Sequence, residues 1–143
     1  MTPEIRQQLK GILLRHESCK LFPYTDSTGH GHLTIGVGRN LSDRGISQPE
    51  AIQMLENDID YFYNKLFDMF DWFRKLDNVR QIVLVDMCFN LGIRGLLEFT
   101  DMLSALQRGD YVGASNEILN SLAAKQCQNR YEDNSEIMLT GKI

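Results

Sequence analysis

The chain has 143 residues, of which 43% are hydrophobic and 24% are charged, and its net charge at pH 7 is −4. This length suits a single compact domain that buries about two-thirds of the surface of its unfolded chain, so a disulfide framework is not needed. The three cysteines, Cys19, Cys88 and Cys127, are odd in number and irregularly spaced, which predicts free thiols made in a reducing compartment.

Targeting signals are missing from the first residues, which lack the basic, apolar and small-residue succession of a secretory signal peptide. No apolar run approaches the roughly 20 residues that a membrane span needs. We therefore expect synthesis in the cytoplasm without a signal peptide, no stable membrane insertion, and release by another component if the protein acts outside the cell.

The first predicted element is an amphipathic helix. Thr2 reads as its N-cap, followed by Pro3 at the first helical position and an acid in the first turn. Its apolar residues fall on one face and carry the helix to about residue 15 or 16: Ile5, Leu9, Ile12 and Leu13. Two short strands then follow, at 21–24 and 33–37, joined by a bend rich in glycine and histidine.

A long helix is predicted to begin near Gln48, because Ser47 and Glu50 form a capping box. Residues 50–71 carry a net charge of −5, so the rest of the chain sums to +1, and residues 1–49 sum to +2. We interpret the acidic stretch as a solvated helix face.

The remainder reads as a set of helices. The first should be capped by Asp77 or Asn78, run through the apolar stretch 82–89, and end at Leu91 before Gly92. Short helices should then start at Thr100 and at Asp110, and a last, poorly patterned helix holds two polar residues of interest: Gln126 and Arg130.

Two carboxylates and a hydroxyl stand out in the first third of the chain. An inverting glycosidase needs a protonated carboxyl and an ionised carboxylate roughly 6.5–9.5 Å apart. Glu17 follows the first helix, whose negative end disfavours the ionised form and suits an acid. Asp26 lies in a polar turn that favours the ionised form, and Thr34 is placed to orient a water with its hydroxyl. On spacing alone, ordinary surface positions are the favoured interpretation of both acids, because short motifs have high false-positive rates.

Three other chemistries have weaker support. His30 and His32 with Asp26 make a possible metal site, but an HxH pair lacks a third clear ligand. Cys19 lies close to Glu17, yet no histidine and asparagine pattern supports a cysteine nucleophile. The Gly36-Val37-Gly38 run follows a strand without a third glycine opening a helix, which excludes a dinucleotide loop.

The same residues carry a resemblance to a known family. Glu17, Tyr24, Asp26 and Thr34, followed by Ile-Gly-Val-Gly-Arg-Asn-Leu at 35–41, resemble the phage-type lysozymes, glycoside hydrolase family 24. The resemblance continues through Phe89-Asn90-Leu91-Gly92, Phe99-Thr100, Ser121, Gln126, Arg130 and Thr140-Gly141. It implies that Glu17, Asp26 and Thr34 are catalytic, that Asn40, Phe89 and Asn90 line the sugar cleft, and that Arg130 faces the catalytic glutamate. A core aromatic at Phe89 and turn or helix-end amides at Asn40 and Asn90 fit the sequence equally well.

The chain departs from the family pattern at several points. Ser18 stands where the family has glycine, Ala123 where it has tryptophan, and Tyr131 where it has a small residue. Two extra residues lie between Asp26 and Thr34. Because side chains alternate along a strand, an even insertion keeps Thr34 on its original face.

The expected fold is α+β, mostly helical and lysozyme-like: a β-containing lobe at about 14–48, a connecting helix at about 49–72, and a helical lobe of 73–143 plus the N-terminal helix. The expected activity is hydrolysis of the β-1,4 bond between N-acetylmuramic acid and N-acetylglucosamine in bacterial peptidoglycan, with inversion and without cofactor or metal. Expected partners are peptidoglycan and a holin or secretion system for release, with no nucleic acid, and the chain is expected to be a monomer. The alternative is a lysozyme-fold module that binds glycan or a protein partner without cutting.

Overall fold

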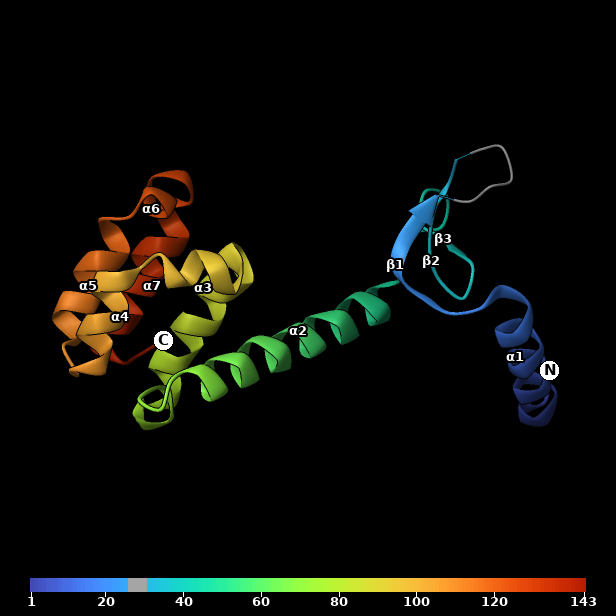
Figure 1. Cartoon of the computed structure of the whole chain (residues 1–143), viewed down its shortest axis with the longest axis horizontal. Coiled ribbons are helices and arrows are strands. Elements are labelled where there is room, and N and C mark those ends of the chain that lie inside the picture. The colour runs from blue at the N-terminus through green and yellow to red at the C-terminus, as the bar shows by residue number, and fades with distance from the viewer. Residues whose placement is uncertain (26–30) are drawn as a thin grey trace. The chain divides into compact units, whose positions relative to one another are not determined.

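The computed structural model describes residues 1–25 and 31–143, which form two compact units, Met1–Gln53 and Met54–Ile143 (Figure 1). The first unit holds α1 (Pro3–Glu17), β1 (Lys20–Thr25), β2 (Leu33–Gly36), β3 (Arg39–Asn40) and the first turns of α2 (Gln48–Met69). The second holds the rest of α2 and then η1 (Phe73–Lys75), α3 (Asn78–Leu97), α4 (Thr100–Gln107), α5 (Tyr111–Leu119), α6 (Leu122–Gln126) and α7 (Gln128–Thr140). The predicted α+β, mostly helical class is confirmed.

Helix α1 begins where the sequence predicted. The hydroxyl Oγ1 of Thr2 accepts a hydrogen bond from the Ile5 backbone N–H at 3.4 Å, and Pro3 occupies the first turn. The helix runs slightly further than expected, to Glu17, and Ser18 ends it with a backbone φ of 57° and ψ of 174°. This sharp change of direction leads the chain into β1.

The three strands form one antiparallel sheet in the order β1-β2-β3. Thr34 pairs with Tyr24 on one side and with Asn40 on the other, and an irregularity interrupts the β1–β2 register between Lys20 and Tyr24. The sequence did not predict β3, because a strand of two residues is too short to show an alternating pattern. Strand β2 ends at Gly36 rather than residue 37, since Val37 and Gly38 make the turn into β3.

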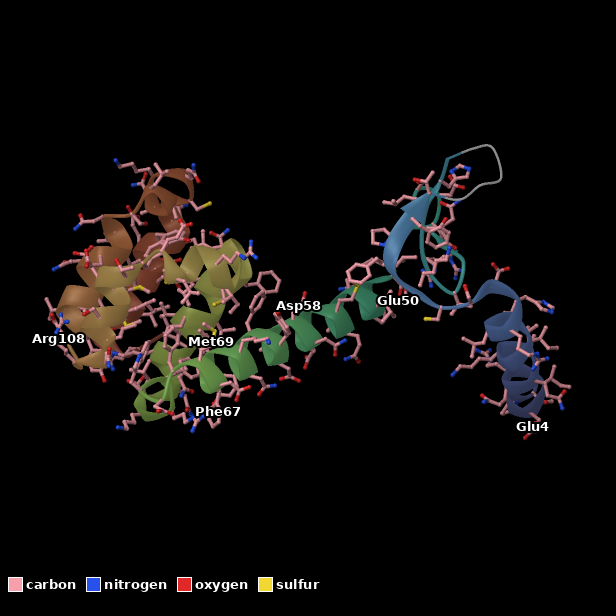
Figure 2. The ribbon with its side chains drawn as sticks, viewed as in Figure 1. Glu4, Glu50, Asp58, Phe67, Met69 and Arg108 are labelled. Carbon is pink, nitrogen blue, oxygen red and sulfur yellow. The ribbon has the colours of Figure 1, made fainter. Side chains whose placement is uncertain are left out.

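The predicted capping box at the start of α2 is confirmed. The backbone N–H and the hydroxyl of Ser47 both donate to Oε2 of Glu50 at 2.8 Å. Glu50 lies in the first turn of the helix (Figure 2), where its carboxylate also accepts from both Nη atoms of Arg39, at 2.6 and 3.2 Å. The Arg39 contact and the Ser47 bonds lower the pKa of Glu50 to about 2. An ion pair therefore ties β3 to the helix that follows it.

The second unit has a continuous hydrophobic core. Helix α3 contributes much of this core, as its apolar run predicted, and α4, α5 and α7 of the same unit contribute further buried residues (Figure 1). The fully buried large side chains are Leu66, Phe73, Val83, Leu84, Met87, Cys88, Leu96, Met102, Ile118, Tyr131 and Met138. Among the helices of the described residues, none has the length and apolar character to cross a membrane.

Two helices in this unit differ from their predicted form. Gly92 breaks the regular path of α3 with φ 70° and ψ 169°, as expected of a glycine stop, but helical structure resumes and reaches Leu97. Helix α7 showed little pattern in sequence because its buried face includes polar residues, Asn134 and Ser135, beside Tyr131 and Met138. The buried hydroxyl of Ser135 is hydrogen-bonded to the hydroxyl of Ser115, with 2.7 Å between the two oxygens. The predicted division into lobes with boundaries at 48 and 72 stays a prediction.

Candidate active site

Glu17, the predicted general acid, lies at the last position of α1, and its side chain rests against the β2–β3 turn. A Cβ atom built on Gly38 would lie 3.0 Å from Oε2, 3.3 Å from Cδ and 3.5 Å from Cγ of Glu17. The carboxyl group therefore sits directly over the bare face of Gly38. This contact joins the end of the helix to the hairpin within the first unit.

Thr34, the predicted water-orienting residue, lies on the middle strand of the sheet. Its side chain is buried, with 4% of the residue exposed, and its hydroxyl donates to the carbonyl oxygen of His32 at 3.2 Å. A hydroxyl has one donor and two acceptor positions, so this bond leaves acceptor capacity on Oγ1. Asp26, the predicted base, lies outside the described residues.

Asn40, a predicted sugar contact, is engaged in the turn that follows β3. Its Nδ2 donates to Oδ2 of Asp43 at 2.9 Å, and its Oδ1 accepts from the Asp43 backbone N–H at 3.0 Å. Both ends of the amide thus organise residues 40–43. This is the turn chemistry that asparagine commonly provides.

Arg130, the predicted supporting cation, is held by Asp86 in the second unit. Its Nε lies 2.9 Å from Oδ2 and its Nη2 lies 2.9 Å from Oδ1 of that carboxylate, which is the paired geometry of strong arginine–carboxylate contacts. Asn134 donates to the same Oδ2 at 2.7 Å. The hydrogen bond to Asp86 raises the pKa of Arg130 above its ordinary value.

Sequence reasoning missed Asp86 and Asn134, although one signal was present. Asp86 is the charged residue inside the apolar run 82–89 of a helix predicted to be central. A carboxylate in such a run requires a partner, because an unpaired charge away from water is costly. The sequence did not show that the partner would be Arg130.

Asn90 and Phe89, the other predicted sugar contacts, lie next to each other on α3. The hydroxyl of Tyr131 donates to Oδ1 of Asn90 at 3.0 Å. Phe89 is 43% exposed, and its ring meets Phe62 edge to face with centroids 6.1 Å apart. Asn90 therefore has a fixed orientation, while part of the Phe89 ring is open to solvent.

Comparison with known proteins now decides the family. The family model described as "Phage lysozyme" matches residues 14–130, which is most of the chain and includes every predicted site residue. The chain belongs to the phage lysozyme family. Membership agrees with the α+β, lysozyme-like fold and with a lysozyme-type glycan hydrolase in general.

Two curated proteins are similar to this member of the phage lysozyme family at low sequence identity. "Probable T4-type lysozyme 1" of Dictyostelium discoideum is 27% identical over 164 residues, covering 94% of this chain and 95% of the relative. "Pre-baseplate central spike protein Gp5" of Enterobacteria phage T4 is 25% identical over 158 residues, covering 92% of this chain. The chain spans only 28% of the length of the spike protein.

Other residues of the phage lysozyme pattern meet around one hollow of about 380 Å³ in the second unit. Its lining includes four motif residues and the alanine that replaces the family's tryptophan: Phe99, Thr100, Ser121, Gln126 and Ala123. Tyr131, the other departure in this region, is fully buried, and its ring stacks on Phe99 with centroids 6.5 Å apart. A large residue after Arg130 is thus accommodated by packing inside the core.

The described residues can be searched for metal-binding groups and for disulfide bonds. Across residues 1–25 and 31–143, no group of three or more His, Cys, Asp or Glu side chains is placed to hold a metal ion. The predicted metal alternative also needs Asp26 and His30, which lie outside that part of the chain. The three cysteines are free, as predicted: Cys19 and Cys127 are exposed, whereas Cys88 is buried.

Proposed function

We propose that this protein is a muramidase that hydrolyses the β-1,4 bond between N-acetylmuramic acid and N-acetylglucosamine in bacterial peptidoglycan, with inversion. The observation that carries the proposal is the placement of the Glu17 carboxyl on the β2–β3 turn, next to the strand that bears Thr34. A general acid must be held in a defined position to protonate a leaving oxygen. Membership of the phage lysozyme family supports the reaction class.

Each residue has a proposed role. Glu17 protonates the glycosidic oxygen as the bond to the sugar breaks, and Asp26 accepts the proton of the attacking water. Thr34 helps to place that water through the acceptor capacity of its hydroxyl. The family resemblance assigns sugar contacts to Asn40, Phe89 and Asn90, and the support of the catalytic acid to Arg130. The proposed reaction uses only carboxyl chemistry and takes no cofactor.

The test is the release of new reducing ends from purified peptidoglycan sacculi. The unmodified protein should release reducing ends of the muramic type, and Glu17→Gln and Asp26→Asn should each lose this activity by several orders of magnitude. Asp58→Asn is the control, because it neutralises an exposed acid of α2 that has no proposed catalytic or binding role. Its activity should stay within about threefold, since surface substitutions usually have small effects. Release of glucosamine-type ends would contradict the bond assignment.

The stereochemical part of the proposal needs a separate measurement. Proton NMR of the first product should show the α-anomer before mutarotation, because direct attack by water inverts a β-linkage. A β-anomer as first product would replace the inverting mechanism by a retaining one.

A second candidate is a module that binds glycan, or a protein partner, without cutting it. Two observations favour it: the Thr34 hydroxyl is buried against the His32 carbonyl, and both ends of the Asn40 amide are used in a turn. A pull-down with sacculi separates the two candidates. Retention on sacculi without any reducing ends would establish the binding module, and cleavage abolished by Glu17→Gln would exclude it.

A further inference from the structure

The contact between Glu17 and Gly38 has a geometry that suggests a role for the glycine. Three successive atoms of the Glu17 side chain, Oε2, Cδ and Cγ, lie 3.0 to 3.5 Å from the place where a Gly38 side chain would begin. Gly38 itself has a φ of 68°, which L side chains rarely adopt. The turn therefore presents bare backbone to the part of Glu17 that would carry out the chemistry.

We propose that Gly38 is a positioning residue for the catalytic acid. Because glycine has no side chain, the Glu17 carboxyl can lie directly against the β2–β3 turn. This inference rests on the proposed function of Glu17. A glutamate at the end of a helix has three side-chain torsions to restrain. Within the first unit, the contact that holds the Glu17 side chain is its close approach to Gly38.

Gly36 provides a matched control in the same hairpin. Its φ is 67°, almost equal to that of Gly38, but a Cβ atom built on it would meet nothing within 4 Å. Alanine at either position imposes similar backbone strain, because both glycines have a positive φ of almost the same value. Only alanine at position 38 would also push against Glu17. The difference between the two variants therefore separates the effect of the contact with Glu17 from the effect of backbone strain.

The enzymatic test compares Gly38→Ala with Gly36→Ala on sacculi, per folded molecule. A Cβ at position 38 requires the Glu17 side chain to move by a few tenths of an ångström. Because a displacement of about 1 Å costs on the order of 100-fold in rate, Gly38→Ala should lower kcat by roughly 4- to 10-fold with KM little changed. Gly36→Ala should stay within about threefold. In a Glu17→Gln background, Gly38→Ala should cause no further loss. Equal losses in the two single variants would overturn the proposal and assign the effect to backbone strain.

Two NMR measurements keep the inference testable without activity. In the unmodified protein, the γ protons of Glu17 should show a nuclear Overhauser effect to the α protons of Gly38, and its absence would overturn the proposal. The Glu17 side-chain carboxyl carbon, assigned with Glu17→Gln, should move in Gly38→Ala and stay in place in Gly36→Ala. If the unmodified protein cuts no sacculi while these NMR contacts are present, the proposed function fails and the contact between Glu17 and Gly38 is only structural.

Discussion

Asp86 on α3 and Arg130 on α7 are 44 positions apart in sequence and form an ion pair within the second unit. The carboxylate receives Nε and Nη2 of the guanidinium, and Asn134 donates to the same carboxylate. The pair and Asn134 are all half-buried or buried, and they lie at the junction of two core helices. Arg130, to which the family resemblance assigns the support of the catalytic acid, is thus held in place by Asp86. Asp86 is not one of the residues that carry the resemblance.

Removing this anchor should destabilise the fold. Asp86→Ala leaves Arg130 and Asn134 without their acceptor, and hydrogen bonds to charged groups are worth about 1.5–3 kcal/mol. We expect the free energy of unfolding in urea to fall by about that amount. Asp133→Ala, at an exposed position of α7, is the control and should change it by less than about 0.5 kcal/mol. Equal losses would show that the Asp86 network contributes nothing specific.

Ser18 is the one residue other than glycine with a positive φ among the described residues, and it stands where the family has glycine. Its φ of 57° and ψ of 174° belong to a region that is essentially restricted to glycine and costs of order 1–3 kcal/mol in other residues. Ser18→Gly should therefore raise the free energy of unfolding by about 1 kcal/mol, after the entropy lost by glycine is counted. Ser18→Ala keeps the strain and should give no gain. A gain in both variants would show that the strain is not the cause.

The ion pair between Arg39 and Glu50 predicts a specific dependence of stability on pH. The pKa of Glu50 is lowered from 4.5 to about 2 when folded, so its contribution is complete above about pH 4.5 and is lost as the pH falls toward 2. The difference in Tm between the unmodified protein and Glu50→Gln should shrink across this window. In an Arg39→Gln background, which lacks the other partner of the ion pair, the same difference should depend less on pH. A difference that stays constant from pH 5 to pH 2 would refute the prediction.

The three thiols should differ in reactivity. Burial raises the pKa of Cys88 to about 12, and the thiolate is the reactive form, whereas Cys19 and Cys127 are exposed. A thiol-specific disulfide reagent at pH 8 should modify two cysteines of the native protein quickly and the third only on unfolding. Cys88→Ala should remove the slow phase alone. Rapid modification of all three thiols in the native protein would contradict the buried position of Cys88.

Local patterns in the sequence determined much of this protein. The capping residues Thr2, Ser47 and Asp77 mark helix starts within one residue, because an N-cap acts on backbone N–H groups only two or three positions away. The motif around Glu17 and Thr34 indicated the family, since catalytic residue types at fixed spacing are themselves a local signal. Asp26 stays a prediction of the same kind.

The tertiary structure decided which distant groups meet. Glu17 lies on Gly38, Arg130 on Asp86, and the Tyr131 hydroxyl on Asn90. The polar face of α7 could not be recognised as buried, because the partners that satisfy it come from α3 and α5. Hydrophobic periodicity and helix capping reflect interactions between residues that are close together in the chain. The choice of a partner 44 positions away depends on how whole helices pack, and no window of sequence contains that information.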